Sequence, residues 1–309
     1  MPLLLKDGHT ISFIMTCKAS PEYTKTEDDF KDFAFGKRIP FLITEKINSP
    51  ETIEFVRKNK ADIAISANWK TLIKKEFISE FKLGIINAHP GDLPKFRGNA
   101  CSNWAIITGE KKLVATLHFM DEGLDEGDIL LKKSIRITEE TTIGDTTEKL
   151  IEIYPKMFAE VINRLEKKTI RPMKQAKKGA SRGYSRTPED SEINWNSKAS
   201  EIDRLVRGSS KPFSGAYTYL DGKKLIVWKA HPVKSKIKNL GTPGQVAERR
   251  KGFISILTKE GFLVLDEIEY EGKKAEASEI IKSGRERLGM NYSKEIEILR
   301  KKIDELQAK

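Results

Sequence analysis

Short β-like runs alternate with helical patterns through the first half of the chain, and this alternation restricts the fold more than any other feature. Strands are predicted at residues 9–16, 39–43, 62–66, 84–88, 113–120 and 129–137. Helices are predicted at residues 49–58, where Ser49 can cap, and at residues 99–108 and 141–168. Pro155 should kink or interrupt the last helix. The order indicates an α/β domain with a Rossmann-like, mostly parallel sheet.

The character of the chain changes after residue 168. A basic, linker-like segment at about residues 168–186 leads to short strands at 216–220, 224–230, 241–247, 253–257 and 262–268. The Asp221-Gly222 step predicts a tight hairpin turn, and the strand spacing favours a small β-barrel. We therefore propose two domains, residues 1–205 and 206–309. The final helix, 292–309, has apolar residues spaced as in a short coiled-coil seam, but we expect it to pack on its own domain.

Composition excludes several classes of protein. No run approaches 18 apolar residues, and the apolar start is too short for a signal peptide, so we expect a cytoplasmic protein with no membrane contact. The two cysteines, Cys17 and Cys101, lie far apart, which excludes a thiolate zinc site and a disulfide framework. The net charge is +11, and residues 149–186 hold eleven basic and three acidic residues. This stretch could attract phosphates of a nucleotide or RNA, or could be a solvated helix face and linker.

Residues 84–128 carry most of the polar chemistry. Asn87 and His89 lie two apart at the end of a predicted strand, so both side chains share one face at the sheet edge where α/β proteins bind ligands. A glycine-rich loop containing Asp125 follows a later strand. An amide, a base and a carboxylate suit transfer of an acyl group to an amine. No serine or cysteine stands in a nucleophile setting, which favours direct transfer over an acyl-enzyme. No phosphate-binding GxGxxG or P-loop motif is present.

The strings NAHPGDLPKFRG and MDEGLDEGDI resemble the folate-dependent formyltransferase family. The resemblance implies transfer of a formyl group from 10-formyltetrahydrofolate, as co-substrate, to an amine without a metal. It also implies that Asn87, His89 and Asp125 are catalytic. The residues implied to line the folate pocket are Thr71, Leu72, Ile73, Asp121 and Asp128. Residues 185–195 and 211–230 resemble the family's domain junction and the opening of its small C-terminal domain, which is similar to an OB fold.

Two branches of this family fit the two-domain layout, and they differ in the acceptor amine. One formylates methionine esterified to initiator tRNA, and the other formylates an amino-sugar nucleotide. The tRNA enzymes usually carry a basic insertion after the second strand, where this chain has acidic residues that would repel phosphate, Glu27, Asp28, Asp29 and Asp32. The pair Asn103-Trp104 and the string from Arg186 to Asp190 also look more like the sugar-nucleotide branch. The resemblance therefore implies an amino-sugar nucleotide as acceptor and partner, bound by Arg97, Asn103, Trp104 and Arg186.

Two alternatives remain open at this point. A methionyl-tRNA formyltransferase is the first, with tRNA as the less favoured partner, and an RNA-binding protein without catalysis is the second. The enzyme could form a homodimer. Members of the family also begin with a strand, a turn and a helix before the segment matching residues 9–16, whereas this chain starts MPLLLKDGH. We expect the first, central strand of the sheet to be missing, which would leave two strand edges unpaired.

Overall fold

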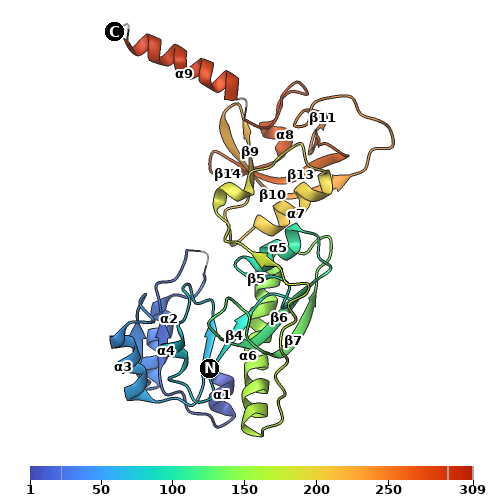
Figure 1. Cartoon of the computed structure of the whole chain (residues 1–309). Helices are drawn as coiled ribbons and strands as arrows, with labels where there is room; N and C mark the ends of the chain where they lie inside the picture. Colours follow the sequence, from blue (N-terminus) through green and yellow to red (C-terminus); the bar gives the residue numbers. More distant parts are fainter. Residues whose placement is uncertain (22, 291, 308–309) are drawn as a thin grey trace. The chain divides into compact units, whose positions relative to one another are not determined.

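The computed structural model describes residues 1–21, 23–290 and 292–307. Its contacts divide the chain into two compact units (Figure 1). Unit 1 comprises Met1–Ala105, Glu110–Glu139 and Gly144–Ser185, and unit 2 comprises Ile106–Gly109, Glu140–Ile143 and Arg186–Lys309. The boundary proposed from the sequence, between residues 205 and 206, falls within helix α7 (Ala199–Ser209) of unit 2.

Within the described residues, unit 1 contains two main sheets and a further two-residue parallel pairing of β5 (Arg97–Gly98) with β8 (Arg182–Gly183). The larger has the order β3 (Ala64–Ala67), β4 (Ile85–His89), β6 (Lys112–Phe119) and β7 (Ile129–Arg136). Strands β3 and β4 run parallel, whereas β6 runs antiparallel to both of its neighbours, β4 and β7. The smaller sheet is a parallel pair, β1 (Ile14–Thr16) and β2 (Phe41–Ile43). The predicted α/β class is confirmed.

Side chains, rather than a ladder, connect the two sheets within the described residues. Met15 of β1 and Ala64 of β3 pack against one apolar cluster that contains Phe77, Phe81 and Ile85. The strand predicted over residues 9–16 is shorter than expected, since only its last three residues pair. At its start, the backbone N–H of His9 donates to the carbonyl of Leu4 at 3.0 Å instead of pairing with a strand, and the His9 side chain forms a hydrogen bond of 2.9 Å with Asn163.

The three helices predicted in this half are present. Helix α3 (Pro50–Asn59) is capped as predicted, because Ser49 Oγ accepts a hydrogen bond from the backbone of Thr52. Helix α6 (Ile143–Glu166) runs as one helix through Pro155, so the predicted interruption is absent. Proline leaves the carbonyl of Ile151 without its helical donor, but Ile151 is 64% exposed and water can satisfy it. The third predicted helix is α5 (Cys101–Ile107), and three others, α1 (Pro2–Lys6), α2 (Glu27–Gly36) and α4 (Lys75–Ile78), were not predicted.

Unit 2 is an antiparallel β domain with short helices. Its six-stranded sheet has the order β11 (Val246–Arg250), β12 (Phe253–Leu257), β13 (Phe262–Tyr270), β10 (Lys223–Val233) and β9 (Ala216–Leu220), with β14 (Lys273–Ala275) on β13. Asp221 and Gly222 have φ of 48° and 74°, as the predicted hairpin turn requires. The strand predicted at residues 241–247 lies later, at β11. The short helices are η1 (Pro188–Ser191), α7 and α8 (Ala277–Ile280).

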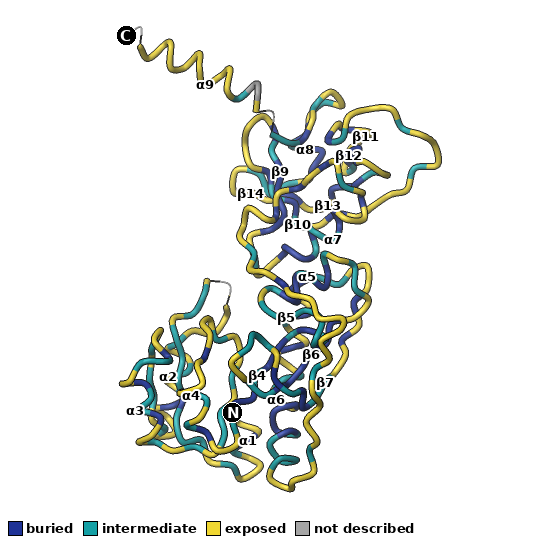
Figure 2. The backbone as a smooth tube through the Cα atoms, in the orientation of Figure 1, coloured by how far each residue is buried: buried dark blue, intermediate teal, exposed yellow. Residues whose placement is uncertain are grey.

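The last helix, α9 (Tyr292–Gln307), exists where predicted, but the expectation that it packs on its own domain is wrong. Its apolar positions Ile296, Leu299, Ile303 and Leu306 are 50%, 56%, 51% and 72% exposed, and Figure 2 shows most of it as exposed. The apolar core of unit 2 is completed by α7 and α8 instead. None of the described helices is long and apolar enough to cross a membrane.

Candidate active site

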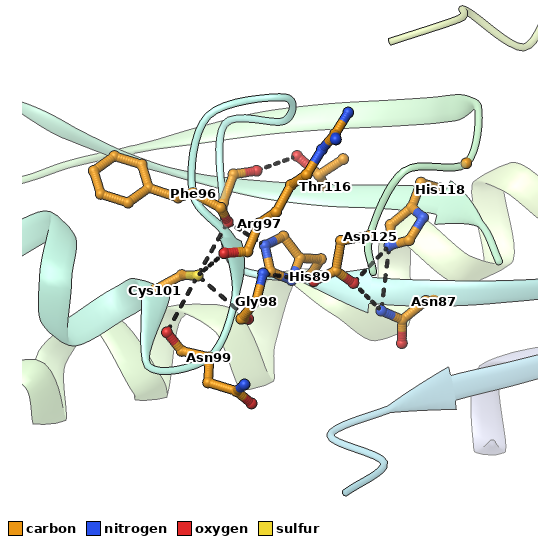
Figure 3. A network of polar contacts seen from close by, with 12 residues as sticks. Asn87, His89, Phe96, Arg97, Gly98, Asn99, Cys101, Thr116, His118 and Asp125 are labelled. Atoms are coloured by element: carbon orange, nitrogen blue, oxygen red, sulfur yellow. Dashed lines mark hydrogen bonds and ion pairs between the residues drawn. The ribbon is translucent and has the colours of Figure 1, made fainter. Parts of the chain in front are cut away.

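Neighbouring strands of unit 1 bring the predicted catalytic residues together. Asn87 and His89 lie at the carboxyl end of β4, and the register places them opposite His118 and Thr116 of β6. Asp125 lies in the connection between β6 and β7. Figure 3 shows the side chains of Asn87, His89, His118 and Asp125 converging on one point. The cross-strand pairing explains the convergence, because directly opposed residues project on the same face of a sheet.

The Asp125 carboxylate is the centre of this cluster. Its Oδ2 accepts a hydrogen bond of 2.8 Å from the backbone N–H of Gly98 and lies 3.5 Å from Nδ1 of His89. Its Oδ1 lies 3.4 Å from Nε2 of His118 and 3.5 Å from the amide nitrogen of Asn87. The side chain is only 11% exposed. Asp125 is therefore held by groups from three separate segments.

The loop after β4 fixes the tautomer of His89. Nε2 of His89 lies 2.5 Å from the carbonyl oxygen of Phe96. A carbonyl can only accept, so Nε2 carries the hydrogen and the lone pair of the neutral ring is on Nδ1, which faces Asp125. Gly91 is required here, because a Cβ at this position would overlap both the Phe96 carbonyl and the His89 ring.

Burial and charge set the protonation states. Burial lowers the pKa of His89, and although the Asp125 carboxylate and the Phe96 carbonyl oppose this, the pKa stays below its ordinary value. Burial alone would raise the pKa of Asp125, but the neighbouring His118 and His89 rings and the Gly98 N–H together hold this pKa below its usual range. At neutral pH the site therefore offers a neutral imidazole beside an ionised carboxylate.

His118 was missed in the sequence analysis. It is 1% exposed, and its Nδ1 donates to the carbonyl of Phe119 at 2.7 Å. Its Nε2 also lies 3.3 Å from the amide nitrogen of Asn87. The signal in the sequence was an ionisable residue near the end of the mostly apolar run of β6. Gln175, which hydrogen-bonds to Arg97 and to the backbone of Asp125, was also missed. It carried no such signal, because it lies in a segment of linker-like composition.

The residues predicted to line the folate pocket lie on two adjacent loops. Ile73 and Met120 pack in the same apolar cluster, and Lys75 pairs with Glu122 at 3.8 Å. Leu72 is 55% exposed, and Thr71 accepts a hydrogen bond from the Trp69 ring. The second loop begins at Asp121, where burial raises the pKa, and ends at Asp128, whose carbonyl accepts from Phe119. Their role in binding stays a prediction.

Of the four residues predicted to bind the acceptor, three belong to unit 1 and one to unit 2. Arg97 donates to Glu126 at 2.6 Å, and Trp104 donates to the carbonyl of Tyr184 at 2.8 Å. Asn103 is buried on α5. Arg186 belongs to unit 2, where it donates to the carbonyl of Asp190 and to the hydroxyls of Ser191 and Ser209.

Comparison with known proteins adds independent information. The family described as "Formyl transferase" matches residues 11–162, and the family described as "Formyl transferase, C-terminal domain" matches residues 186–285. The methionyl-tRNA formyltransferase of Clostridium tetani is 36% identical over 79% of this chain and 78% of its own length. The enzyme of the same name from Caldanaerobacter subterraneus is 34% identical over 79% and 78%.

Solved structures share the fold at low identity. WlaRD, a sugar 3N-formyl transferase, aligns with a TM-score of 0.62 at 20% identity, over 88% of this chain and 93% of that chain. HypX from Aquifex aeolicus in complex with tetrahydrofolic acid aligns with a TM-score of 0.59 at 19% identity, over 88% of this chain and 47% of that chain. At these identities the likeness shows the fold alone.

The comparisons overturn the predicted acceptor. Relatives of 27–36% identity over most of the chain are named methionyl-tRNA formyltransferases, so the prediction of a sugar nucleotide as substrate and partner, with tRNA less favoured, is wrong. The structure explains the error, because Glu27, Asp28 and Asp29 form the first turn of α2. Asp29 accepts from the backbone of Thr26 as part of a capping box. Acidic side chains stabilise a helix N-terminus, so these residues have a local structural reason.

Proposed function

The chain belongs to the formyltransferase family, and from this premise we propose that it transfers a formyl group from 10-formyltetrahydrofolate to the amino group of methionine esterified to initiator tRNA. The names of its relatives support the acceptor. The donor is supported by the family and by the tetrahydrofolate complex of a protein with the same fold.

The single observation that carries the proposal is the cluster of Asn87, His89 and Asp125. The neutral imidazole of His89 and the amide nitrogen of Asn87 each lie 3.5 Å from an oxygen of the ionised Asp125 carboxylate. Nδ1 of His89 accepts the proton of the attacking amine while the bond from nitrogen to the formyl carbon forms. Asn87 donates a hydrogen bond to the formyl oxygen as negative charge develops there. The bond from the formyl carbon to the folate nitrogen then breaks, and His89 returns its proton to that nitrogen.

The residues on the folate side are suited to an amphipathic ring system. The exposed side chain of Leu72 offers apolar surface, while Thr71, Asp121 and Asp128 supply polar groups on the adjoining loops. We assign Thr71, Leu72, Ile73, Asp121 and Asp128 to this binding surface. Burial and the Asp125 carboxylate raise the pKa of Cys101, the cysteine nearest the cluster, to about 12. Its thiol therefore stays protonated at neutral pH and is a poor nucleophile, so we assign it no covalent intermediate.

Charge supports a nucleic-acid acceptor. The net charge of +11 is concentrated in residues 149–186, and the exposed cations of the segment after α6 include Arg171, Lys174 and Arg182. Clustered lysine and arginine bind phosphates by releasing counterions, so binding weakens steeply with salt. The rate of formylation at limiting methionyl-tRNA should therefore fall as the salt concentration rises.

The decisive experiment is formylation of methionyl-tRNA by the purified protein with 10-formyltetrahydrofolate. Formyl-methionine released from the tRNA is measured by mass spectrometry, with His89→Asn as the inactive control. We expect multiple turnovers with the wild-type protein and almost none with the variant. Absence of formyl-methionine under conditions in which 5-formyltetrahydrofolate binds by calorimetry would overturn the proposed acceptor while keeping the donor.

A further inference from the structure

The segment after α6 is bound along its length to both loops of the candidate site. Met173 and Ile129 exchange two backbone hydrogen bonds of 2.8 Å each. Further along, β8 (Arg182–Gly183) pairs in parallel with β5 (Arg97–Gly98). We call residues 173–184 the strap. It was predicted to be a linker, yet it crosses from the loop of Asp125 to the loop that contacts His89.

One side chain of the strap connects the two loops directly. Nε2 of Gln175 donates to the backbone carbonyls of Asp125 and Gly127, both at 2.8 Å. Its Oε1 accepts from Arg97, at 2.9 Å from Nη2 and 3.2 Å from Nε. The orientation of this amide is fixed by chemistry, because carbonyls only accept and a guanidinium only donates. Gln175 therefore uses both of its donor hydrogens and its acceptor in this single contact set.

The contact matters because the backbone of Asp125 has an uncommon conformation. Its φ is 54°, in the left-handed region that few residues other than glycine adopt. Aspartate tolerates this region better than most residues, and hydrogen bonds to its backbone help to hold it there. Gln175 bonds to the carbonyl of this very residue, while Arg97, held by the same amide, precedes the Gly98 N–H that binds the Asp125 carboxylate. The backbone and the side chain of Asp125 are thus both set through Gln175.

We propose that Gln175 is a positioning residue that holds the Asp125 carboxylate against His89 without touching either substrate. The inference rests on the proposed function, since the reaction is what positioning serves. Two variants separate its roles. Gln175→Glu keeps the length and the acceptor for Arg97 but loses both donors and turns an oxygen toward the carbonyls of Asp125 and Gly127. Gln175→Leu loses every hydrogen bond and adds no charge.

Kinetics provide the first test. Misplacement of a catalytic group by about 1 Å costs about 100-fold in rate, so we expect kcat to fall by about that factor in both variants. KM for methionyl-tRNA and the Kd of 5-formyltetrahydrofolate should change little, because Gln175 contacts neither. Gln307→Glu, the same substitution at an exposed position of α9, is the matched control and should keep its kcat. Equal kcat in Gln175→Glu and wild type would overturn the proposal.

A spectroscopic test needs no turnover. The Gly98 N–H bonded to the Asp125 carboxylate reports the position of that group, and labelling arginine carbonyls with 13C and glycine amides with 15N selects only the three Arg-Gly steps of the chain. Comparison with Asp125→Asn identifies the Gly98 signal. We expect this signal to shift in Gln175→Leu, or in Gln175→Met should the leucine variant unfold. An unmoved Gly98 signal in a folded variant would refute the inference, even if the proposed acceptor is wrong and no rate can be measured.

Discussion

Replacing Asp125 with asparagine tests the electrostatic core of the site. The change keeps the shape but removes a charge whose Oδ2 lies 3.5 Å from Nδ1 of His89. At this distance two unit charges interact by about 4–5 kcal/mol at an effective dielectric constant of about 20, and by about 1 kcal/mol in water. The imidazolium exists only after His89 has taken the amine proton, so this energy favours the transition state over the ground state. We expect kcat to fall by about 10- to 1,000-fold.

The same substitution should shift the pH dependence in a defined direction. His89 must be neutral to act as a base, so activity is present above its pKa and is lost as the pH falls through it. The Asp125 carboxylate raises the pKa of His89 against the effect of burial, and its removal should lower this pKa further. The acid limb of kcat/KM for methionyl-tRNA should therefore move to lower pH in Asp125→Asn, but not in the control Asp304→Asn on α9. An acid limb that moves to higher pH, or an unchanged kcat, would refute this reasoning.

Three further outcomes test the structure away from the reaction. Cys101 is 2% exposed and its pKa is raised to about 12, so iodoacetamide at mildly alkaline pH should label it rapidly only after unfolding; rapid labelling of the native protein would contradict its burial. The buried hydroxyl of Tyr154 has no hydrogen-bond partner among the described residues. Tyr154→Phe should therefore leave the free energy of unfolding in urea unchanged or raise it by about 1–2 kcal/mol. A decrease in this free energy would show that the hydroxyl has a partner. Ending the chain after Met290 should barely change the thermal midpoint of unfolding, because α9 is exposed. By contrast, Ile281→Ala in the core of unit 2 should lower the free energy of unfolding by about 2–5 kcal/mol.

Local patterns were enough to predict the elements that hold Asn87 and His89. The apolar run of β4 and the alternation of its side chains depend only on neighbouring residues, and the structure has the strand where the pattern indicated. The Asp-Gly turn between β9 and β10 was equally local, since its positive φ angles suit these two residues. The family resemblance supplied Asp125, whose distance from β4 in the sequence hides its proximity in space.

The parts that escaped prediction depend on contacts between distant segments. Gln175 reaches Arg97 and Asp125, which precede it by 78 and 50 residues, and nothing in a basic, glycine-punctuated segment distinguishes such a strap from a free linker. The apolar spacing of α9 was correct, but a two-heptad pattern does not say what covers it. Pro155 was misjudged for a related reason, because its cost depends on whether the carbonyl of Ile151 can reach water.

The error over the acceptor shows how charge must be weighed when a partner is inferred. A carboxylate can repel phosphate only with the charge that its own neighbours leave uncompensated. Asp29 pairs with Lys25 at 2.7 Å and also caps α2, and Glu27 accepts a hydrogen bond of 2.9 Å from the backbone of Ala19. These local bonds explain why acidic residues stand at the start of α2, whether the acceptor is a sugar nucleotide or a tRNA. The excess of positive charge in residues 149–186 is far less compensated, since that segment holds three acidic residues against eleven basic ones. This charge favours a phosphate-bearing acceptor, a nucleotide as much as a nucleic acid, so the choice between the two acceptors depends on the relatives rather than on charge.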